Sequence, residues 1–343
     1  VVVSASHNPY TDNGIKFFSA DGFKLTDEQE LAIEQSLEKK LPEVESQGVI
    51  TTIDDSVDRY GHFCVQASKL TSLSGLSVVI DAANGAAYEV APAVFKALGA
   101  TVTVIAAEPD GQNINEHCGA VHPEALQQKV IECQADLGVA FDGDGDRLIM
   151  VDHKGRVVDG DQILYGLVVS RLPDIHARGV VGTLMTNFGF EQAMKELDVN
   201  FVRAKVGDRY VLEQLRERGW FLGGEASGHL IDLKHATTGD ALLAVLQVCE
   251  LLVRQKSSLA ELVAGMSQCP QVLINVSITP SFDLASPSLQ NEIKHAQASL
   301  ADSGRVLIRK SGTEPLVRVM VEGLEANQVT KLAEQLADVI RSM

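Results

Sequence analysis

The sequence predicts an α/β protein of several domains, in which repeated mixed α/β units precede a small C-terminal α+β domain. A chain of 343 residues is long enough for about two to four domains at roughly 100 to 200 residues each. Apolar runs that end at turn residues alternate with helical patterns through most of the chain. The last part instead shows a strand, a helix, two strands and a helix. The expected domains are 1–57, 58–153, 154–267 and 268–343.

The chain opens on VVVSASHNPY. Three consecutive valines are typical of the inside of a sheet, so Val1–Val3 are predicted to form a buried strand whose partners are encoded upstream. This strand leads Ser6 into a turn formed by His7, Asn8 and Pro9. The opening therefore predicts a serine that is presented at the end of a strand.

The remaining elements follow from periodicity and from cap and turn residues. Residues 1–57 are expected to hold a strand at 15–18, a helix at 26–40 capped by Thr26, and a linker at 47–56. The next part is expected to hold helices at 57–70, 86–98 and 123–133 and strands at 76–81, 101–106, 137–141 and 148–152. The pattern recurs with helices at 162–172, 190–197 and 211–218, two further helices up to Gly265, and strands at 180–185, 201–204 and 220–222. The last part is expected to hold strands at 272–278, 305–308 and 317–321 and helices at 287–301 and 327–340.

Charge and composition exclude several classes of partner. The 46 acidic residues against 29 basic residues give a net charge of −17, which disfavours binding to nucleic acid or to an anionic membrane. An anionic ligand must then be met by local cations. The longest apolar stretch, 242–253, is too short to span a bilayer. Five cysteines without a CxxC pair are typical of reduced thiols in a cytoplasmic protein.

The segment DGDGDR joins two predicted strands and carries three carboxylates at alternate positions, Asp142, Asp144 and Asp146. The intervening glycines allow the backbone to fold so that the carboxylates converge. Converging carboxylates need a cation, and ligands that are all oxygen suit a hard ion such as Mg²⁺. A calcium EF-hand does not fit, because Arg147 and His153 stand where that loop requires Gly and Glu. A solvated acidic turn is the remaining alternative.

A cationic loop joins two predicted strands of the last domain, and it comprises Arg309, Lys310, Ser311, Gly312 and Thr313, with Arg318 shortly after. Guanidinium groups, hydroxyls and backbone amides shaped by glycine form a cradle for a phosphate or a carboxylate. In so acidic a chain, this local cluster favours an anion site over the alternative, a hairpin turn with solvated arginines.

Two further loops are candidates for ligand contacts. In GGEASGH, Glu225 and Ser227 offer an acceptor and a hydroxyl suited to sugar hydroxyls, whereas a histidine such as His229 is more often structural. Gly207, Asp208 and Arg209 stand at the start of a predicted helix, where Arg209 and the helix N-terminus suit an anion. The alternative is that Asp208 serves as the helix cap.

Common nucleotide and hydrolase motifs are absent from the sequence. No GxxxxGK[ST], no GxGxxG after a strand and no GxSxG occurs, so neither a P-loop nucleotide, nor a dinucleotide, nor a nucleophile elbow is indicated. The serine, the acidic loop and the cationic loop therefore require a joint explanation.

SASHNP, DGDGDR, GEASGH and RKSGTEP, in this order, resemble the α-D-phosphohexomutase (phosphoglucomutase/phosphomannomutase) superfamily over essentially the whole chain. RKSGTEPLVRVMVEG looks most like the branch that acts on glucosamine phosphates, because Gly312 follows the loop serine where phosphomannomutase/phosphoglucomutase relatives usually carry Asn. Ala226 departs from that branch, which commonly has Gln or Asn there. In the family the first domain starts well before the serine, so on the order of ninety residues are expected to be absent upstream of Val1.

The resemblance implies an isomerase that interconverts glucosamine 6-phosphate and glucosamine 1-phosphate for amino-sugar nucleotide synthesis. Ser6 matches the family's phosphoserine, and glucosamine 1,6-bisphosphate is the implied intermediate and activator. One Mg²⁺ ion is implied, and its ligands would be the Ser6 phosphate and the residues Asp142, Asp144 and Asp146. Such an ion neutralises charge while a phosphoryl group moves.

The resemblance also implies roles for the other motif residues. Arg147 lies beside the transferring group, and His7 and Lys16 match family residues near the phosphoserine. A lysine acts as a general base only where its pKa is lowered. Sugar-hydroxyl contacts are implied for Glu225 and Ser227, and further substrate contacts for Gly207, Asp208 and Arg209. The passive phosphate site is implied at Arg309, Ser311, Gly312, Thr313 and Arg318.

Some alternatives stay open from the sequence. One is the broader phosphomannomutase or phosphoglucomutase specificity, and another is a truncated, inactive protein that binds sugar phosphate or metal. The expected setting is cytoplasmic, with a small phosphosugar as the partner and with neither nucleic acid nor a membrane. A homodimer is left open, because the sequence does not fix the oligomeric state.

Overall fold

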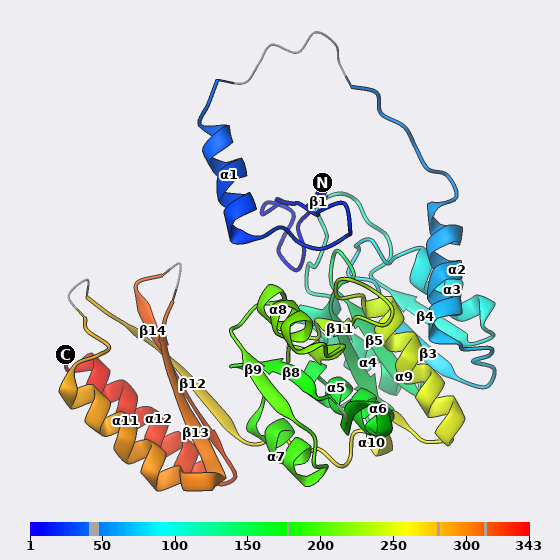
Figure 1. The fold of residues 1–343 in the computed structure, drawn as a ribbon. Coiled ribbons are helices and arrows are strands. Elements are labelled where there is room, and N and C mark those ends of the chain that lie inside the picture. Colours follow the sequence, from blue (N-terminus) through cyan, green and yellow to red (C-terminus); the bar gives the residue numbers. More distant parts are fainter. Residues whose placement is uncertain (41–47, 177, 280–281, 312–313) are drawn as a thin grey trace.

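The computed structural model describes residues 1–40, 48–176, 178–279, 282–311 and 314–343. It is an α/β chain whose sheets follow one another along the sequence (Figure 1). The first part holds β1 (Val2–Ser4), β2 (Gly14–Lys16) and α1 (Asp27–Leu37). The predicted cap of α1 is confirmed, because Thr26 forms a capping box with Gln29.

The three N-terminal valines do not form a buried strand. Strand β1 pairs only with β2, in an antiparallel ribbon, and Val1 and Val3 are 81% and 71% exposed. The expected burial of Val1–Val3 is therefore not seen among the described residues, where the ribbon contacts the rest of the fold through Ser4 and Lys16 and leaves these valines exposed.

The second part forms a sheet with the strand order β4-β3-β5-β6-β7. Its elements are α2 (Ser56–Ser68), β3 (Ser77–Asp81), α3 (Val90–Ala97), β4 (Thr101–Ile105), α4 (Glu124–Cys133), β5 (Leu137–Phe141), β6 (Leu148–Asp152) and β7 (Val157–Val158). Strands β3 and β5 run parallel, so their carboxyl ends meet at one edge of the sheet, and β6 returns antiparallel to β5. The turn from β5 to β6 thus lies beside the end of β3.

The third part forms a second sheet, with the order β11-β10-β8-β9. Its strands are β8 (Val180–Thr183), β9 (Phe201–Ala204), β10 (Leu222–Gly224) and β11 (Leu230–Asp232). Its helices are α5 (Gly160–Val169), α6 (Leu172–His176), α7 (Phe188–Glu196), α8 (Asp208–Arg218), α9 (Ala241–Gln255) and α10 (Leu259–Leu262). Strand β7, helix α6 and strand β11 lie where the sequence patterns predict no element, and each is short.

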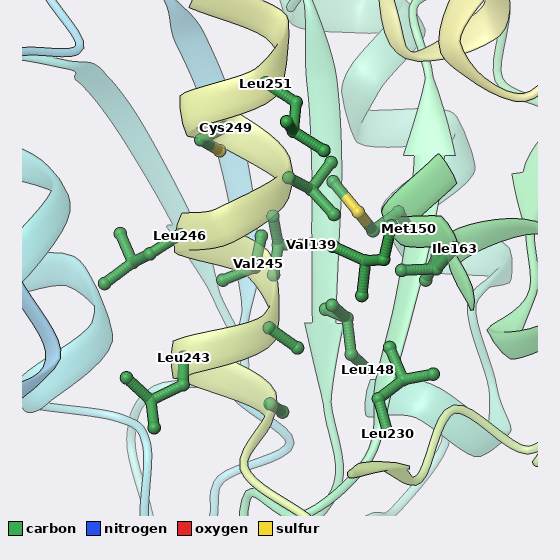
Figure 2. Close-up of a cluster of buried hydrophobic side chains, with 14 of the residues drawn as sticks. Val139, Leu148, Met150, Ile163, Leu230, Leu243, Val245, Leu246, Cys249 and Leu251 are labelled. Atoms are coloured by element: carbon green, nitrogen blue, oxygen red, sulfur yellow. The ribbon is translucent and has the colours of Figure 1, made fainter. Parts of the chain in front are cut away.

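The second and third parts share one hydrophobic core. The cluster that contains Phe95 and Met150 of the second part also contains Leu164 and Leu246 of the third part. Figure 2 shows side chains of β5 and β6, such as Val139 and Met150, next to side chains of α9, such as Leu251. Burial of apolar surface across both units holds their two sheets together as one packed body.

The C-terminal part is an antiparallel sheet with the order β12-β14-β13, covered by α11 and α12 (Figure 1). Its elements are β12 (Gln271–Ser277), α11 (Pro287–Leu300), β13 (Gly304–Lys310), β14 (Leu316–Gly323) and α12 (Ala326–Arg341). The predicted α+β layer is confirmed, and it has a hydrophobic core of its own.

No helix among the described residues is long and apolar enough to cross a membrane.

A buried ion pair joins the C-terminal part to the third part. Arg305 pairs with Glu322, whose side chain is fully buried, and its Nη2 also donates to the carbonyls of Leu184 (2.8 Å) and Thr186 (3.0 Å). Arg305 thus binds one oxygen of a buried carboxylate and two carbonyls of the neighbouring unit at the same time.

We expect Arg305→Ala to destabilise the fold by about 3–5 kcal/mol, because it leaves the Glu322 carboxylate buried without its cation. Arg341→Ala is the matched control, since Arg341 and Asp338 form an exposed pair, and its loss costs about 1 kcal/mol or less. Urea denaturation followed by circular dichroism measures both. Equal shifts in the two variants would contradict the role assigned to Arg305.

Candidate active site

The turn between β5 and β6 is folded by its own first aspartate. Asp142 Oδ1 accepts hydrogen bonds from the backbone N–H groups of Asp146 and Arg147, both at 3.0 Å. Gly143 is required here, since a Cβ at that position would lie 2.5 Å from the carbonyl oxygen of Ser6. The turn is thus wound tightly, with its glycine pressed against the Ser6 turn.

Three carboxylates converge in this turn, as the sequence predicts. Ligand oxygens of Asp142, Asp144 and Asp146 lie within 4.8 Å of one another. One oxygen of each is buried without a hydrogen-bond partner, Oδ2 of Asp142 and Oδ1 of the other two. Buried oxygens without partners are costly unless a cation binds them, and a set of oxygen ligands suits a hard divalent ion. These residues therefore fit Mg²⁺.

The electrostatics of the turn point the same way. Burial, followed by the charges of Asp146 and Asp144, raises the pKa of Asp142 to about 8. Burial alone would also raise the pKa of Asp146, but the nearby His229 ring and the charge of Lys16 outweigh it and lower that pKa. Without a cation, the three groups are therefore not all ionised at neutral pH.

Side chains of the first part reach the acidic turn. Lys16 pairs with Asp144 and lies 3.3 Å from Asp146 Oδ2, and the Ser4 hydroxyl donates to Asp144 Oδ2 at 3.1 Å. Burial alone would lower the pKa of Lys16, but the hydrogen bond to Asp144 and the charges of Asp146 and Asp144 raise it. The contacts with these two carboxylates therefore favour the protonated form of Lys16.

Ser6 lies at the centre of a tight turn above the acidic loop. Its φ of 52° is in the left-handed region, which is uncommon for a serine. Its Oγ lies 3.4 Å from Nδ1 of His7, whose pKa is lowered by burial and by the charge of Arg147. Arg147 is itself close to the turn, with Nε 3.9 Å from Asp142 Oδ2. Ser6, His7, Lys16 and Arg147 are thus brought together with the three aspartates.

Two loops of the third part meet this cluster through His229. Its ring nitrogens lie 3.5 Å from Asp146 Oδ1 and 3.3 Å from Asp208 Oδ2. The first distance is at the limit of a hydrogen bond. Burial alone would lower the pKa of His229, but Asp146 and Asp208 raise it, which favours the charged ring. Glu225 Oε1 accepts from the Gly207 N–H at 2.9 Å, which joins the two loops. Ser227 is exposed beside them.

The start of α8 differs from one alternative drawn from the sequence. The N-cap is Gly207, with φ of 124°, so the interpretation of Asp208 as the cap is wrong. Asp208 instead pairs with Lys24 as well as with His229. Arg209 pairs with Asp27 and Glu30 of α1, so its guanidinium is engaged with that helix.

The cationic loop of the C-terminal part forms a second, separate cluster. Arg309 and Arg318 are direct cross-strand partners of β13 and β14. Like charges directly opposite each other are destabilising, so this pair suits a bound anion. Arg318 Nη2 lies 3.5 Å from Glu314, and its Nε is buried without a partner. Gly312 and Thr313 lie outside the described residues. Ser311 is described, and its N–H donates to the Leu316 carbonyl at 2.9 Å.

Two residues that contact the site carry little functional signal in the sequence. Asn115 donates to carbonyls of the Ser6 turn, and its place in a loop far from Ser6 gives no local signal. The sequence alone favours a structural role for His229, although its position next to Glu225 and Ser227 is a signal for a functional one.

The sequence matches four family models in chain order. They are described as phosphoglucomutase/phosphomannomutase alpha/beta/alpha domain I (residues 1–43), domain II (54–155), domain III (159–269) and the C-terminal domain (273–339). The matches cover most of the chain.

Curated relatives are similar over nearly the whole chain. A phosphoglucosamine mutase of Pseudomonas entomophila (strain L48) is 54% identical over an alignment of 350 residues. The alignment covers 99% of this chain and 78% of the relative. A phosphoglucosamine mutase of Alcanivorax borkumensis is 53% identical over 345 residues, with the same coverage of 99% and 78%.

Solved structures share the fold at low sequence identity. Aspergillus fumigatus N-acetylphosphoglucosamine mutase, in complex with GlcNAc-6P and magnesium, is 19% identical with a TM-score of 0.80 and covers 99% of this chain and 88% of its own. A phosphoglucomutase/phosphomannomutase family protein from Burkholderia thailandensis is 24% identical with a TM-score of 0.78, and the match covers 99% and 75%.

We expect Asp144→Asn to weaken Mg²⁺ binding by at least the 10- to 100-fold that loss of an outer-shell partner of a metal typically costs. Added Mg²⁺ should raise the melting temperature of the unmodified chain and leave that of the variant nearly unchanged, because a ligand stabilises the state that binds it. Asp54→Asn is the matched control, since Asp54 is an exposed aspartate of the 48–56 segment. Equal stabilisation by Mg²⁺ in Asp144→Asn and in the control would count decisively against the metal site.

Proposed function

The chain belongs to the phosphoglucomutase/phosphomannomutase family, and we propose that it interconverts glucosamine 6-phosphate and glucosamine 1-phosphate through a phosphorylated Ser6. The observation that carries the proposal is the direct apposition of the Ser6 turn and the three-carboxylate turn. Ser4 bonds Asp144, and Gly143 packs against the Ser6 carbonyl. The relatives named phosphoglucosamine mutase support the glucosamine substrate.

The proposed reaction consists of two transfers. Phosphorylated Ser6 gives its phosphoryl group to the free hydroxyl of the sugar phosphate, which yields glucosamine 1,6-bisphosphate and a free Ser6 hydroxyl. After the bisphosphate has turned around, its other phosphoryl group passes to Ser6 Oγ and leaves the product. Each transfer breaks one P–O bond and forms another, so no external donor is consumed.

Asp142, Asp144 and Asp146 would hold one Mg²⁺ ion together with an oxygen of the Ser6 phosphate. When bound, such an ion neutralises the charge that develops on the phosphoryl group during transfer. The free oxygens of the three aspartates support this assignment, and magnesium is present in the Aspergillus fumigatus structure.

The cations around Ser6 are proposed to bind and orient the phosphoryl group. Lys16 has a raised pKa and acts as an ammonium that pairs with phosphate oxygens. Arg147, close to Asp142 Oδ2, contributes a guanidinium on the same side. His7 has a lowered pKa, and as a neutral ring 3.4 Å from Ser6 Oγ it orients that hydroxyl through a hydrogen bond.

The bisphosphate must reorient between the two transfers. This requires sugar contacts that work in both orientations and a second site for the phosphate that does not react. Glu225 and Ser227 are proposed as the sugar contacts, beside Gly207, Asp208 and Arg209. The cross-strand pair Arg309 and Arg318, with Ser311, Gly312 and Thr313, is proposed as the passive phosphate site, because two opposed guanidinium groups match one phosphate dianion.

We also propose a cytoplasmic setting. All five cysteines are free thiols, and four of them are buried, which suits a reducing compartment.

A coupled assay that compares glucosamine, glucose and mannose 1-phosphates, each with a trace of the matching bisphosphate, tests the substrate. We expect turnover of the glucosamine phosphate to exceed the other two by about tenfold or more, a difference of about 1.4 kcal/mol in transition-state binding. Equal rates with all three sugars would favour the broader phosphomannomutase/phosphoglucomutase specificity instead.

We expect Ser6→Ala to abolish mutase turnover and the incorporation of phosphate, because it removes the oxygen that carries the phosphoryl group. Ser36→Ala is the control, since the Ser36 hydroxyl donates only to the Ala32 carbonyl within α1. Phosphopeptide mapping after incubation with labelled bisphosphate gives a second readout. Phosphate on a peptide other than the one that contains Ser6, or full turnover by Ser6→Ala, would refute this role.

A further inference from the structure

We propose that Asn115 is a positioning residue for phosphoryl transfer, which holds the Ser6 turn at a fixed place above the acidic turn. The proposal rests on the role of Ser6 given above and adds a residue from a loop outside the motifs. Asn115 lies between β4 and α4, more than 100 positions from Ser6 along the chain.

The side-chain amide of Asn115 bonds two backbone carbonyls of the Ser6 turn. Its Nδ2 donates to the carbonyl of Ser6 at 2.9 Å and to the carbonyl of Asn8 at 2.8 Å. Asn115 is only 5% exposed, so water has little access to these bonds. The reverse orientation of the amide would place Oδ1 against two carbonyl oxygens, so the hydrogen-bond network fixes the orientation.

Polar contacts rather than packing hold the Ser6 turn: besides the bonds from Asn115, the Ser4 hydroxyl donates to Asp144 at 3.1 Å and accepts from the Ser6 N–H at 2.8 Å. In the described residues 1–40, Ala5 is the only buried residue, so packing contributes little to the placement of this segment. Ser6 has φ of 52°, a left-handed conformation that is unfavourable for a non-glycine residue. Within the turn, the Asn8 N–H bonds the Ala5 carbonyl at 2.9 Å. The two bonds from Asn115 therefore compensate for a strained backbone that packing does not fix.

Asn115 is hydrogen-bonded to the loop 82–86, which is also bonded to the acidic turn. The backbone N–H of Asn115 donates to the Ala83 carbonyl at 2.9 Å. In the same loop as Ala83, the Ala86 N–H donates to the Gly143 carbonyl at 2.8 Å. The loop 82–86 is thus hydrogen-bonded both to Asn115, which bonds the Ser6 carbonyl, and to Gly143 of the acidic turn. Asn115 sets the position of Ser6 relative to the three aspartates through this shared loop.

The loop 82–86 is itself held by a buried carboxylate at the end of β3. Asp81 is fully buried, and it accepts from the N–H groups of Ala83 at 3.0 Å and Gly119 at 2.8 Å. These bonds connect the loop 82–86, which bonds Asn115, to Gly119, which follows Asn115 in its own loop. Asn115 also has φ of 58°, a left-handed conformation that Asn adopts more readily than most residues.

These contacts predict a kinetic effect that a purely structural residue would not have. Asn115 bonds backbone carbonyls and touches neither Ser6 Oγ nor a metal-binding oxygen among the described contacts. Its loss should displace the phosphoryl group in both transfers while sugar binding persists. A misplacement of about 1 Å costs on the order of 100-fold in rate.

We test this with Asn115→Gly, which keeps the left-handed backbone and removes the amide, and with Asn115→Asp, which keeps the shape but replaces the donor with an acceptor. Both should lower kcat by about 10- to 100-fold and change KM for glucosamine 1-phosphate by less than about twofold. Hydrogen exchange at residues 4–8 should increase in both variants, while circular dichroism and the melting temperature report whether each is folded.

Gln134→Gly is the matched control. Gln134 is another left-handed residue with a side-chain amide, with φ of 50°, and it is exposed at the C-cap of α4, outside loop 82–86 and the Ser6 turn. We expect its kcat to stay within about twofold of that of the unmodified chain. If one Asn115 variant fails to fold, the other supplies the measurement, and hydrogen exchange at residues 4–8 is read against Gln134→Gly.

The outcomes separate this inference from the proposed function. If the unmodified chain turns over substrate and carries phosphate on Ser6, but Asn115→Gly or Asn115→Asp keeps its kcat, Asn115 has no positioning role. An equal loss of kcat in Gln134→Gly, or a rise in KM in parallel with the fall in kcat, also overturns it. An unmodified chain with neither turnover nor phosphate on Ser6 overturns the proposed function, and the inference with it.

Discussion

Three carboxylates crowded into one turn are the constraint on which the rest of this site depends. Asp142, Asp144 and Asp146 lie too close together to be ionised without compensation, and each keeps one buried oxygen free. The surrounding cations, Lys16, Arg147 and His229, contact the turn without satisfying those oxygens. The turn is therefore stable as a charged site only with an additional cation, and that requirement is also what phosphoryl transfer needs.

The acidic turn stands on a buried sheet, whereas the other residues of the site lie on segments outside that sheet. Strands β3 and β5 end at the same edge of a buried sheet, and the core beneath them continues into the third part through α9 (Figure 2). Ser6, by contrast, stands on an exposed ribbon, and the Arg309 and Arg318 pair stands on a C-terminal domain with a separate core. The acidic turn thus stands on a packed core, whereas the Ser6 turn is held by polar contacts.

Sequence patterns predicted the parts of the fold and site that local chemistry determines. Strands at 137–141 and 148–152 are confirmed to the residue, because apolar runs bounded by turn residues leave little choice, and the alternation of Asp and Gly predicted the convergence of the carboxylates. The exposure of Val1 and Val3 was not predictable, because it depends on which strands lie alongside. The role of Asn115 was also hidden, since its partners lie more than 100 positions away and only the fold brings them together. Gly312 and Thr313 stay predictions, as do the roles of the individual site residues.

The central claim is that Ser6 transfers a phosphoryl group over a metal ion bound by the three aspartates. Anomalous diffraction from crystals of the Ser6-phosphorylated chain, grown with Mn²⁺ in place of Mg²⁺, locates the ion directly. The account predicts one anomalous peak, within coordination distance of oxygens of Asp142, Asp144 and Asp146 and of one phosphate oxygen on Ser6. A phosphorylated Ser6 with no peak at these aspartates, or with the ion bound elsewhere, would contradict it.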